Sequence, residues 1–234
     1  MDQRIIAIIP ARGGSKGLLR KNIVDLAGSP LIAWTIKASL ESKYITKTLV
    51  SSEDKEILSV ADEYGAEVLE RPKSLAGDTS NSESVVIHAI EYLRSNNETF
   101  DMIVLLQPTS PLRTSKNIDE ALEFKFKREA SGVISIVETD NKVLKTFTSN
   151  RNGFIESIGN NRFPFMRRQE LPKTYLSNGA IYIIDTNEFM NNGSFFTDKT
   201  VGYQMSVIQS LDIDTQSDLD RAAELIGMEG KSWS

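Results

Sequence analysis

Short β-forming runs that lack polar alternation constrain the fold of this chain more than any other feature. Residues 5–9 and 102–106 are apolar throughout. A strand of this kind must be buried on both faces, which is typical of a parallel sheet covered by helices. Strands are predicted at residues 4–9, 46–50, 66–69, 102–106, 132–137, 179–184 and 203–208.

Helix-forming segments alternate with these strands. Pro30 suits the first position of a helix, Ser51 or Ser52 caps the next one, and Ser80 begins a capping box with Glu83. The alternation predicts an α/β fold in three α/β/α layers, Rossmann-like, with a mostly parallel sheet and right-handed crossovers. Helices are predicted at residues 29–42, 52–65, 80–94, 115–130 and 216–226.

The chain has 234 residues, 40% of them hydrophobic, which is enough for a single well-buried domain over residues 1–234. Residues 141–174 break the alternation with short polar and aromatic pieces. We interpret this segment as an inserted arm and expect it to be used in dimerisation.

Charge and composition exclude several classes of function. The net charge of −5 and the pI near 5.1 argue against general nucleic-acid binding, which requires clustered lysine and arginine. The absence of cysteine excludes disulfides and thiolate metal ligands, and we expect the single histidine, His88, to be structural. No stretch reaches the roughly 18–20 apolar residues of a membrane span, so a cytoplasmic protein without membrane partners is expected.

The loop after the first strand is the strongest functional signal. Residues 10–22 read PARGGSKGLLRKN, with three glycines and four cations. Glycines let backbone N–H groups approach phosphates, and the cations Arg12, Lys16, Arg20 and Lys21 can neutralise a triphosphate. The loop is neither a P-loop nor a dinucleotide fingerprint, because no Ser or Thr follows Lys16 and the G-x-G-x-x-G pattern is absent. A flexible loop with solvated cations is the alternative.

This loop resembles the signature of the cytidylyltransferases that activate N-acylneuraminate and related nonulosonates, the CMP-sialic acid synthetase family. Leu19 departs from the proline of many members, which puts the rigidity of the loop in doubt. Further matching blocks follow in the family's order and span nearly the whole chain, at residues 71–83, 106–113, 168–172, 175–182 and 212–215.

The resemblance implies a fold of the nucleotide-diphospho-sugar transferase type, CTP and a nonulosonic sugar as substrates, Mg²⁺ as cofactor, and a homodimer. The matched positions imply nucleotide binding by Ala11, Arg12, Gly13, Lys16, Lys21, Asn22, Arg71 and Ser82. Those of the sugar site are Gln107, Arg168, Gln169, Asn178 and Tyr182. Catalysis is assigned to Arg12, Lys21, Asp212 and Asp214.

Asp212 and Asp214 also make sense without the resemblance. Two residues apart in extended chain, their side chains point to the same face and could meet one cation. Mg²⁺ suits one or two carboxylates completed by substrate phosphates and waters. Alternatively, Asp214 or Thr215 only caps the last helix.

The predicted reaction is therefore attack by the C2 hydroxyl of a nonulosonic sugar on the α-phosphorus of CTP, which releases pyrophosphate. No side chain stands out as general base, and a water activated by the metal is the hypothesis for that role. Two other readings stay open: a nucleotidylyltransferase for 3-deoxy-octulosonate or a sugar-1-phosphate, and a catalytically silent nucleotide-binding protein.

Overall fold

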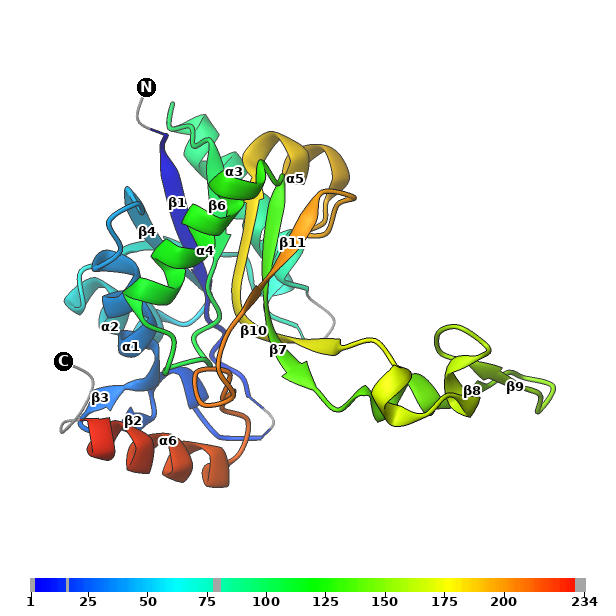
Figure 1. Ribbon diagram of the computed structural model, residues 1–234. Coiled ribbons are helices and arrows are strands. Elements are labelled where there is room, and N and C mark those ends of the chain that lie inside the picture. The colour runs from blue at the N-terminus through cyan, green and yellow to red at the C-terminus, as the bar shows by residue number, and fades with distance from the viewer. Residues whose placement is uncertain (1–2, 16, 78–80, 230–234) are drawn as a thin grey trace.

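The computed structural model of the chain describes residues 3–15, 17–77 and 81–229 (Figure 1). Strands and helices follow one another as β1 (Ile5–Pro10), β2 (Asp25–Leu26), β3 (Ser29–Pro30), α1 (Leu31–Leu40), β4 (Lys47–Ser52), α2 (Lys55–Glu63), β5 (Glu67–Glu70), α3 (Ser82–Ser95), β6 (Met102–Leu105), α4 (Ser115–Arg128), β7 (Gly132–Thr139), β8 (Phe147–Ser149), β9 (Ile155–Ser157), β10 (Thr174–Asp185), α5 (Thr186–Asn192), β11 (Thr200–Gln204) and α6 (Gln216–Glu229). Short 3₁₀ helices occupy Lys21–Ile23, Lys73–Leu75, Asn141–Lys145, Phe163–Phe165 and Arg168–Glu170.

The central sheet has the strand order β11-β7-β10-β6-β1-β4-β5. Strand β1 pairs in parallel with both β4 and β6, and β10 is antiparallel to its two neighbours β6 and β7. The predicted three-layer α/β fold with a mostly parallel sheet is thus confirmed. Among the described helices, none is both long and apolar enough to cross a membrane.

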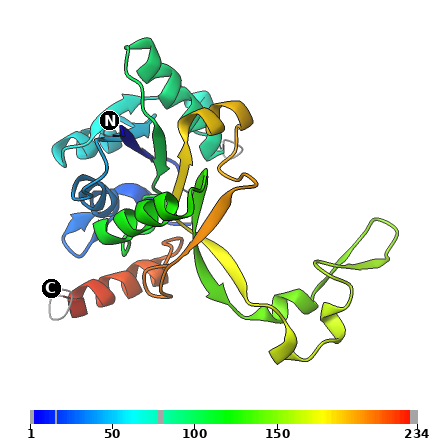
Figure 2. The same cartoon turned by 45° about the horizontal axis from the view of Figure 1, so that its top comes forward.

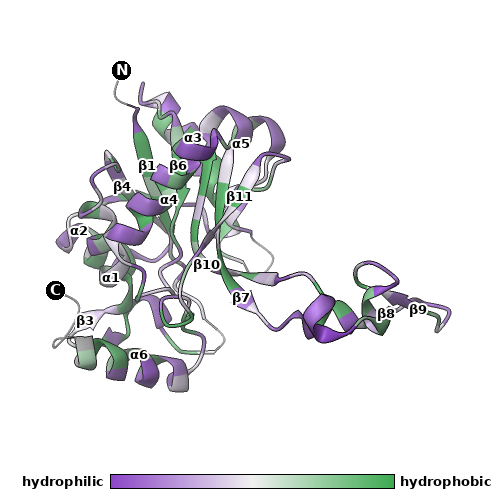
Figure 3. Ribbon diagram, in the orientation of Figure 1, coloured by the Kyte–Doolittle hydropathy of each residue, from purple (hydrophilic) through white to green (hydrophobic). Residues whose placement is uncertain are grey.

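Alternation along β1 divides the core between two helical layers. Ile5, Ala7 and Ile9 pack on the side of α1, α2 and α4, whereas Ile6 and Ile8 pack on the side of α3 and α5. Hydropathy colouring shows apolar strands between helices whose outer faces are polar (Figure 3). Helix α6 covers a third, smaller cluster beside β2 and β3.

The segment between β7 and β10 projects away from the body of the molecule, as both ribbon views show (Figures 1 and 2). It contains the β8–β9 hairpin and three 3₁₀ helices. Strand β10 begins at Thr174, earlier than the predicted 179, and pairs with β7 from Thr139 onward with a register shift between Ser177 and Tyr182. These paired strands therefore form the base of the projecting segment.

The last predicted strand, at residues 203–208, is wrong from residue 205 onward. β11 ends at Gln204, and residues 205–208 leave the sheet in a turn where the amides of Gln209 and Ser210 donate to Ser206. The alternating Met205 and Val207 imitate a strand, although Val207 is 71% exposed. Local hydrogen bonding from a serine competes with the sheet here.

Helix starts also differ from prediction. Ser51 and Ser52 remain in β4, and Asp54 caps α2 by accepting from the amides of Glu56 and Ile57. Pro30 occupies the N-cap position of α1 and is not its first helical residue, so the helix begins one residue later, at Leu31. Ser80 lies outside the described residues, and Asn81 caps α3.

Candidate active site

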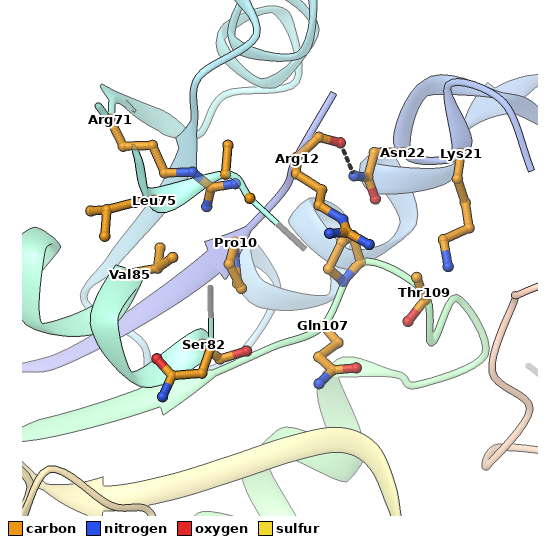
Figure 4. Close-up of a pocket in the computed structure, with 14 residues that line it drawn as sticks. Pro10, Arg12, Lys21, Asn22, Arg71, Leu75, Ser82, Val85, Gln107 and Thr109 are labelled. Atoms are coloured by element: carbon orange, nitrogen blue, oxygen red, sulfur yellow. Dashed lines mark hydrogen bonds between the residues drawn. The ribbon is translucent and has the colours of Figure 1, made fainter. Parts of the chain in front are cut away.

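A pocket of about 290 Å³ opens where β1, β5 and β6 end at their carboxyl termini (Figure 4). Arg12, Asn22 and Lys21 approach it from the loop after β1, and Arg71 and Ser82 from the side of β5 and α3. Parallel strands place their carboxyl ends at one edge, which is where ligands of open α/β sheets bind. The pocket is lined by Pro10, Arg12, Lys21, Asn22, Arg71, Leu75, Ala76, Gly77, Asn81, Ser82, Val85, Gln107, Pro108 and Thr109.

Six predicted site residues thus meet in one cavity within a single chain: Arg12, Lys21, Asn22, Arg71, Ser82 and Gln107. His88 lies one turn beyond Val85 on α3 and does not line it, in keeping with its predicted structural role.

Asn22 brings an unpaired acceptor to this cavity. Its amide nitrogen donates to the backbone carbonyl of Arg12 at 2.8 Å (Figure 4), and its Oδ1 is buried without a partner in the described chain. Because an unmatched buried acceptor costs free energy, the site fits a ligand that supplies an N–H or O–H there. A cytosine amino group and a ribose hydroxyl are both donors of this kind.

Arg71 is held rigidly at the opposite wall. Its Nη1 donates to the carbonyl of Ser51 at 3.2 Å, and its Nε and Nη2 donate to Glu53 Oε2 at 3.2 and 2.9 Å. Burial lowers the pKa of Arg71, Glu53 opposes that shift, and the charge of Arg12 adds to it. The two guanidinium groups are therefore close enough to interact electrostatically.

Three further residues of the phosphate loop, Ala11, Gly13 and Arg20, have partners within the protein. The amide of Ala11 donates to Ser51 at 3.0 Å, and the amide of Gly13 donates to Glu53 Oε1 at 2.7 Å. Arg20 binds Asp54 and Glu56, so its charge is already compensated by carboxylates. Lys16 lies outside the described residues.

Two aspartates lie at the rim of the pocket. The amide of Ile213 donates to the carbonyl of Thr109 at 2.9 Å, which brings the segment of Asp212 and Asp214 to a pocket residue. Lys21 Nζ donates to Asp214 Oδ1 at 2.9 Å. Desolvation raises the pKa of Asp212, a hydrogen bond with Thr109 opposes this, and the charge of Asp214 adds to the rise.

This pair of carboxylates fits a hard divalent cation. A raised pKa means that the negative charge of Asp212 is poorly compensated in the protein itself. Within the described residues no third acidic or histidine side chain joins them in a cluster able to hold a metal. The remaining ligands would have to be water and substrate oxygens, as Mg²⁺ often requires.

Three predicted sugar-site residues lie on β10 or just after β6, and they differ in what they contact: Gln107, Asn178 and Tyr182. Gln107 lines the pocket beside Gly179, where an added Cβ would lie 3.0 Å from Gln107 Oε1. Asn178 is 8% exposed and bonds within the protein, to Ser135 at 2.5 Å among others. The hydroxyl of Tyr182 pairs with Ser177 at 3.1 Å.

Arg168 and Gln169 are not brought to the pocket of their own chain. They line a separate hollow at the base of the projecting segment together with Asp140, and Arg168 Nη2 lies 3.5 Å from Asp140 Oδ1. Within one chain, Arg168 therefore forms a solvent-exposed ion pair. Figure 2 shows this base displaced from the sheet ends where the pocket opens.

Sequence reasoning missed two residues that shape the pocket. Glu53 directly follows β4, so its position at a carboxyl strand end was a usable signal. Arg113 belongs to a block matched with the family, but its burial could not be read from that block. Its guanidinium donates to the carbonyls of Gln107 at 3.1 Å and Ala180 at 2.9 Å and thereby joins β6 to β10.

Comparison with known proteins identifies the family of the chain. The model of the family described as cytidylyltransferase matches residues 6–231. This chain belongs to the cytidylyltransferase family.

Relatives in this family cover most of the chain. An N-acylneuraminate cytidylyltransferase of Streptococcus agalactiae serotype III is 38% identical over 91% of this chain, which spans 51% of that protein. A pseudaminic acid cytidylyltransferase of Campylobacter jejuni is 32% identical and covered to 98%, with 97% of this chain aligned. The CMP-N,N'-diacetyllegionaminic acid synthase of Legionella pneumophila is 38% identical, with coverages of 92% and 93%.

A solved structure supports the fold. CMP:2-keto-3-deoxy-manno-octonic acid synthetase complexed with CTP superposes with a TM-score of 0.71 at 14% identity, covering 97% of this chain and 99% of that one. The chain spans about half the length of the first streptococcal relatives, whereas it matches nearly all of the Campylobacter protein.

Proposed function

We propose that this cytidylyltransferase transfers CMP from CTP to the C2 hydroxyl of a nonulosonic acid and releases pyrophosphate. The observation that carries the proposal is the single pocket that unites Arg12, Lys21, Asn22 and Arg71 beside the acidic rim of Asp212 and Asp214. The named activities of the Streptococcus, Campylobacter and Legionella relatives all concern nonulosonic acids, which supports the acceptor class.

Different residues of the pocket bind different parts of the nucleotide. Arg12 and Lys21 bind the phosphates, because they are the described cations of the loop after β1 that line the pocket. Lys21 Nζ donates to Asp214 Oδ1, so phosphate binding requires that pair to open or to share the lysine. Asn22, Arg71 and Ser82 recognise the base and ribose from the two walls.

The transfer itself needs positioning and charge neutralisation. The acceptor oxygen forms a bond to the α-phosphorus while the bond to pyrophosphate breaks, and negative charge grows on the departing group. Arg12 and Lys21 stabilise that charge by electrostatic contact. The pocket lining contains no Asp, Glu or His among the described residues, so we assign the hydroxyl proton to water.

Mg²⁺ is the cofactor that suits this site, held by Asp212 and Asp214. When bound, it supplies additional positive charge toward the phosphate oxygens. Asp212 and Asp214 would hold it from the rim, where Asp214 accepts a hydrogen bond from Lys21.

We also propose that the working protein is a homodimer in which the projecting segment of one copy completes the sugar site of the other. Arg168 and Gln169 lie on this segment, away from the pocket of their own chain. The segment exposes large apolar side chains that a partner would cover, among them Phe147, Phe154, Ile155, Ile158 and Phe165.

Pyrophosphate release tests the proposed reaction. We expect release with CTP, Mg²⁺ and N-acetylneuraminate or a diacylated nonulosonate, and little with UTP in place of CTP. Release with 3-deoxy-octulosonate or a sugar-1-phosphate alone would reassign the acceptor. Absence of release with every acceptor, despite tight CTP binding, would identify a nucleotide-binding protein instead of an enzyme.

A further inference from the structure

The corner between β4 and α2 contacts two parts of the nucleotide site, the phosphate loop and Arg71. Glu53 directly follows the end of β4, which lies between β1 and β5 in the sheet. The register pairs Pro10 of β1 with Ser51 and Glu70 of β5 with Ser52. The loop after β1, the corner after β4 and Arg71 after β5 are therefore neighbours by topology.

The first contact holds the phosphate loop. The amide of Gly13 donates to Glu53 Oε1 at 2.7 Å. The backbone passes so near the corner that a Cβ on Gly13 would lie 2.4 Å from Asp54 Oδ2, so a larger residue could not follow this path. Arg20 anchors the other end of the loop, with Nη1 2.5 Å from Asp54 Oδ2.

The second contact is with Arg71, which donates hydrogen bonds to the other carboxylate oxygen of Glu53. Glu53 Oε2 accepts from Nε and Nη2 of Arg71 at 3.2 and 2.9 Å, and the two side chains are 13% and 3% exposed. One carboxylate thus bonds both the phosphate loop and the opposite wall of the pocket. Its two oxygens act on different structural elements.

The negative charge of Glu53 also acts on the arginines of the pocket. Arg12 and Arg71 both line the pocket and repel one another, as the effect of Arg12 on the pKa of Arg71 indicates. Glu53 lies against Arg71 and compensates its buried charge. Without that carboxylate, a buried arginine would be left uncompensated, which is strongly unfavourable.

We propose that Glu53 is a positioning residue, which fixes the phosphate loop and the Arg71 guanidinium relative to each other so that a cytidine triphosphate meets both in place. The inference rests on the proposed function only in its choice of CTP as the probe. Preorganisation of this kind improves binding because the loop need not be ordered when the ligand arrives.

Two readouts on three variants test this role. Glu53→Ala removes both contacts, and Glu53→Gln keeps an acceptor for Gly13 but loses the charge. Glu63→Gln makes the same charge change on an exposed residue at the end of the following helix, α2. We would measure hydrogen exchange at the Gly13 amide by NMR in nucleotide-free protein, and the Kd of CTP by calorimetry.

For Glu53→Ala we expect Gly13 exchange and the CTP Kd each to rise about tenfold or more, the scale of one lost charged hydrogen bond. Glu53→Gln should leave Gly13 protected while raising the Kd, and Glu63→Gln should change neither. Unchanged Gly13 exchange, or wild-type CTP affinity, in folded Glu53→Ala would overturn the proposal. If wild-type protein does not bind CTP, the proposed function fails, and the Gly13 exchange alone decides the positioning role.

Discussion

At the scale of single residues, Arg113 is a deeply buried charge beside the active site. It is 1% exposed, its Nη2 donates to Thr35 Oγ1 at 2.6 Å, and its Nε has no partner within the described chain. Burial lowers the pKa of Arg113 to about 9, which still leaves it charged at neutral pH. Its neighbours are backbone carbonyls and a hydroxyl, so hydrogen bonds alone must stabilise the charge.

Replacement of Arg113 by methionine tests that arrangement. The variant leaves the carbonyls of Gln107 and Ala180 without this donor, and each unmatched group costs about 1–3 kcal/mol. Because loss of a desolvated charge offsets part of this, we expect the free energy of unfolding in urea to fall by about 2–4 kcal/mol. Exposed Arg94→Met is the control, and an unchanged or higher unfolding free energy for Arg113→Met would contradict the account.

The acidic rim makes a second prediction at the residue scale. Asp212→Asn and Asp214→Asn keep side-chain shape but remove charge, so each should nearly abolish turnover while the fold persists. Asp212→Asn should also unfold at a higher temperature than wild type without Mg²⁺ at neutral pH. The folded pKa of Asp212 is raised, so its ionisation lowers stability as pH rises through that value.

Thermal unfolding and pyrophosphate release measure both effects, with exposed Asp198→Asn as the matched control. Wild-type turnover in either variant at saturating Mg²⁺ would remove these aspartates from the metal site.

Pairs of elements pack through polar contacts as well as through the core, and α4 against β11 is the clearest case. The hydroxyl of Tyr203 on β11 donates to Glu120 Oε2 at 2.6 Å and accepts from Asn117 Nδ2 at 3.3 Å. Burial and the bond to Glu120 raise the pKa of Tyr203 to about 12. Because the folded pKa exceeds the unfolded value of about 10, this stabilisation is complete below pH 10 and is lost as pH rises toward 12.

Tyr203→Phe isolates the contribution of this contact. We expect a loss of about 1 kcal/mol in unfolding free energy at pH 7, with the gap to wild type closing as pH rises from about 10 toward 12. Exposed Tyr92→Phe on α3 controls for other titrating groups. A gap that stays constant to pH 12 would show that the Tyr203 hydroxyl does not couple these elements.

At the scale of the whole molecule, we propose that the projecting segment forms the dimer contact. Phe154 and Phe165 on it are 71% and 86% exposed. We expect light scattering at micromolar concentration to give a dimer for wild type, and a shift toward monomer for Phe154→Ser with Phe165→Ser. CTP binding should persist in that variant because the nucleotide pocket lies within one chain, whereas turnover should fall. Phe196→Ser, 68% exposed on the body, is the control, and a fully active wild-type monomer would refute the dimer.

The same segment bears on the choice of sugar. Phe163 packs inside it near Gly159, whereas Phe165 faces outward shortly before Arg168. An apolar wall accepts methyl and acyl groups, so we expect kcat/KM to favour a 9-deoxy, diacylated nonulosonate over N-acetylneuraminate, by about 1–3 kcal/mol for one methyl contact. Phe165→Ala should reduce that preference. A tenfold advantage for N-acetylneuraminate would end this argument but leave the cytidylyl transfer intact.

The sequence by itself determined the fold class and the nucleotide wall. Uninterrupted apolar strands such as β1 and β6 must be buried on both faces, and polar residues that directly follow them must gather at one edge of a parallel sheet. The cations of the loop after β1, Arg12 and Lys21 among them, could therefore be expected near this edge, whereas Asn22 and Gln107 were assigned to the site only by the resemblance to the family.

Only the tertiary structure decided which polar groups line the pocket and which bond elsewhere within the protein. Arg20 and Arg113 belong to the same loop or block as pocket residues, and Asn178 to a block assigned to the sugar site, yet each bonds within the protein. The two contacts of Glu53 follow from the place of β4 between β1 and β5. Likewise, Arg168 is separated from the pocket by a projecting segment whose direction no short-range pattern encodes. Side-chain partners distant in sequence are fixed by strand order and packing, and a linear pattern contains neither.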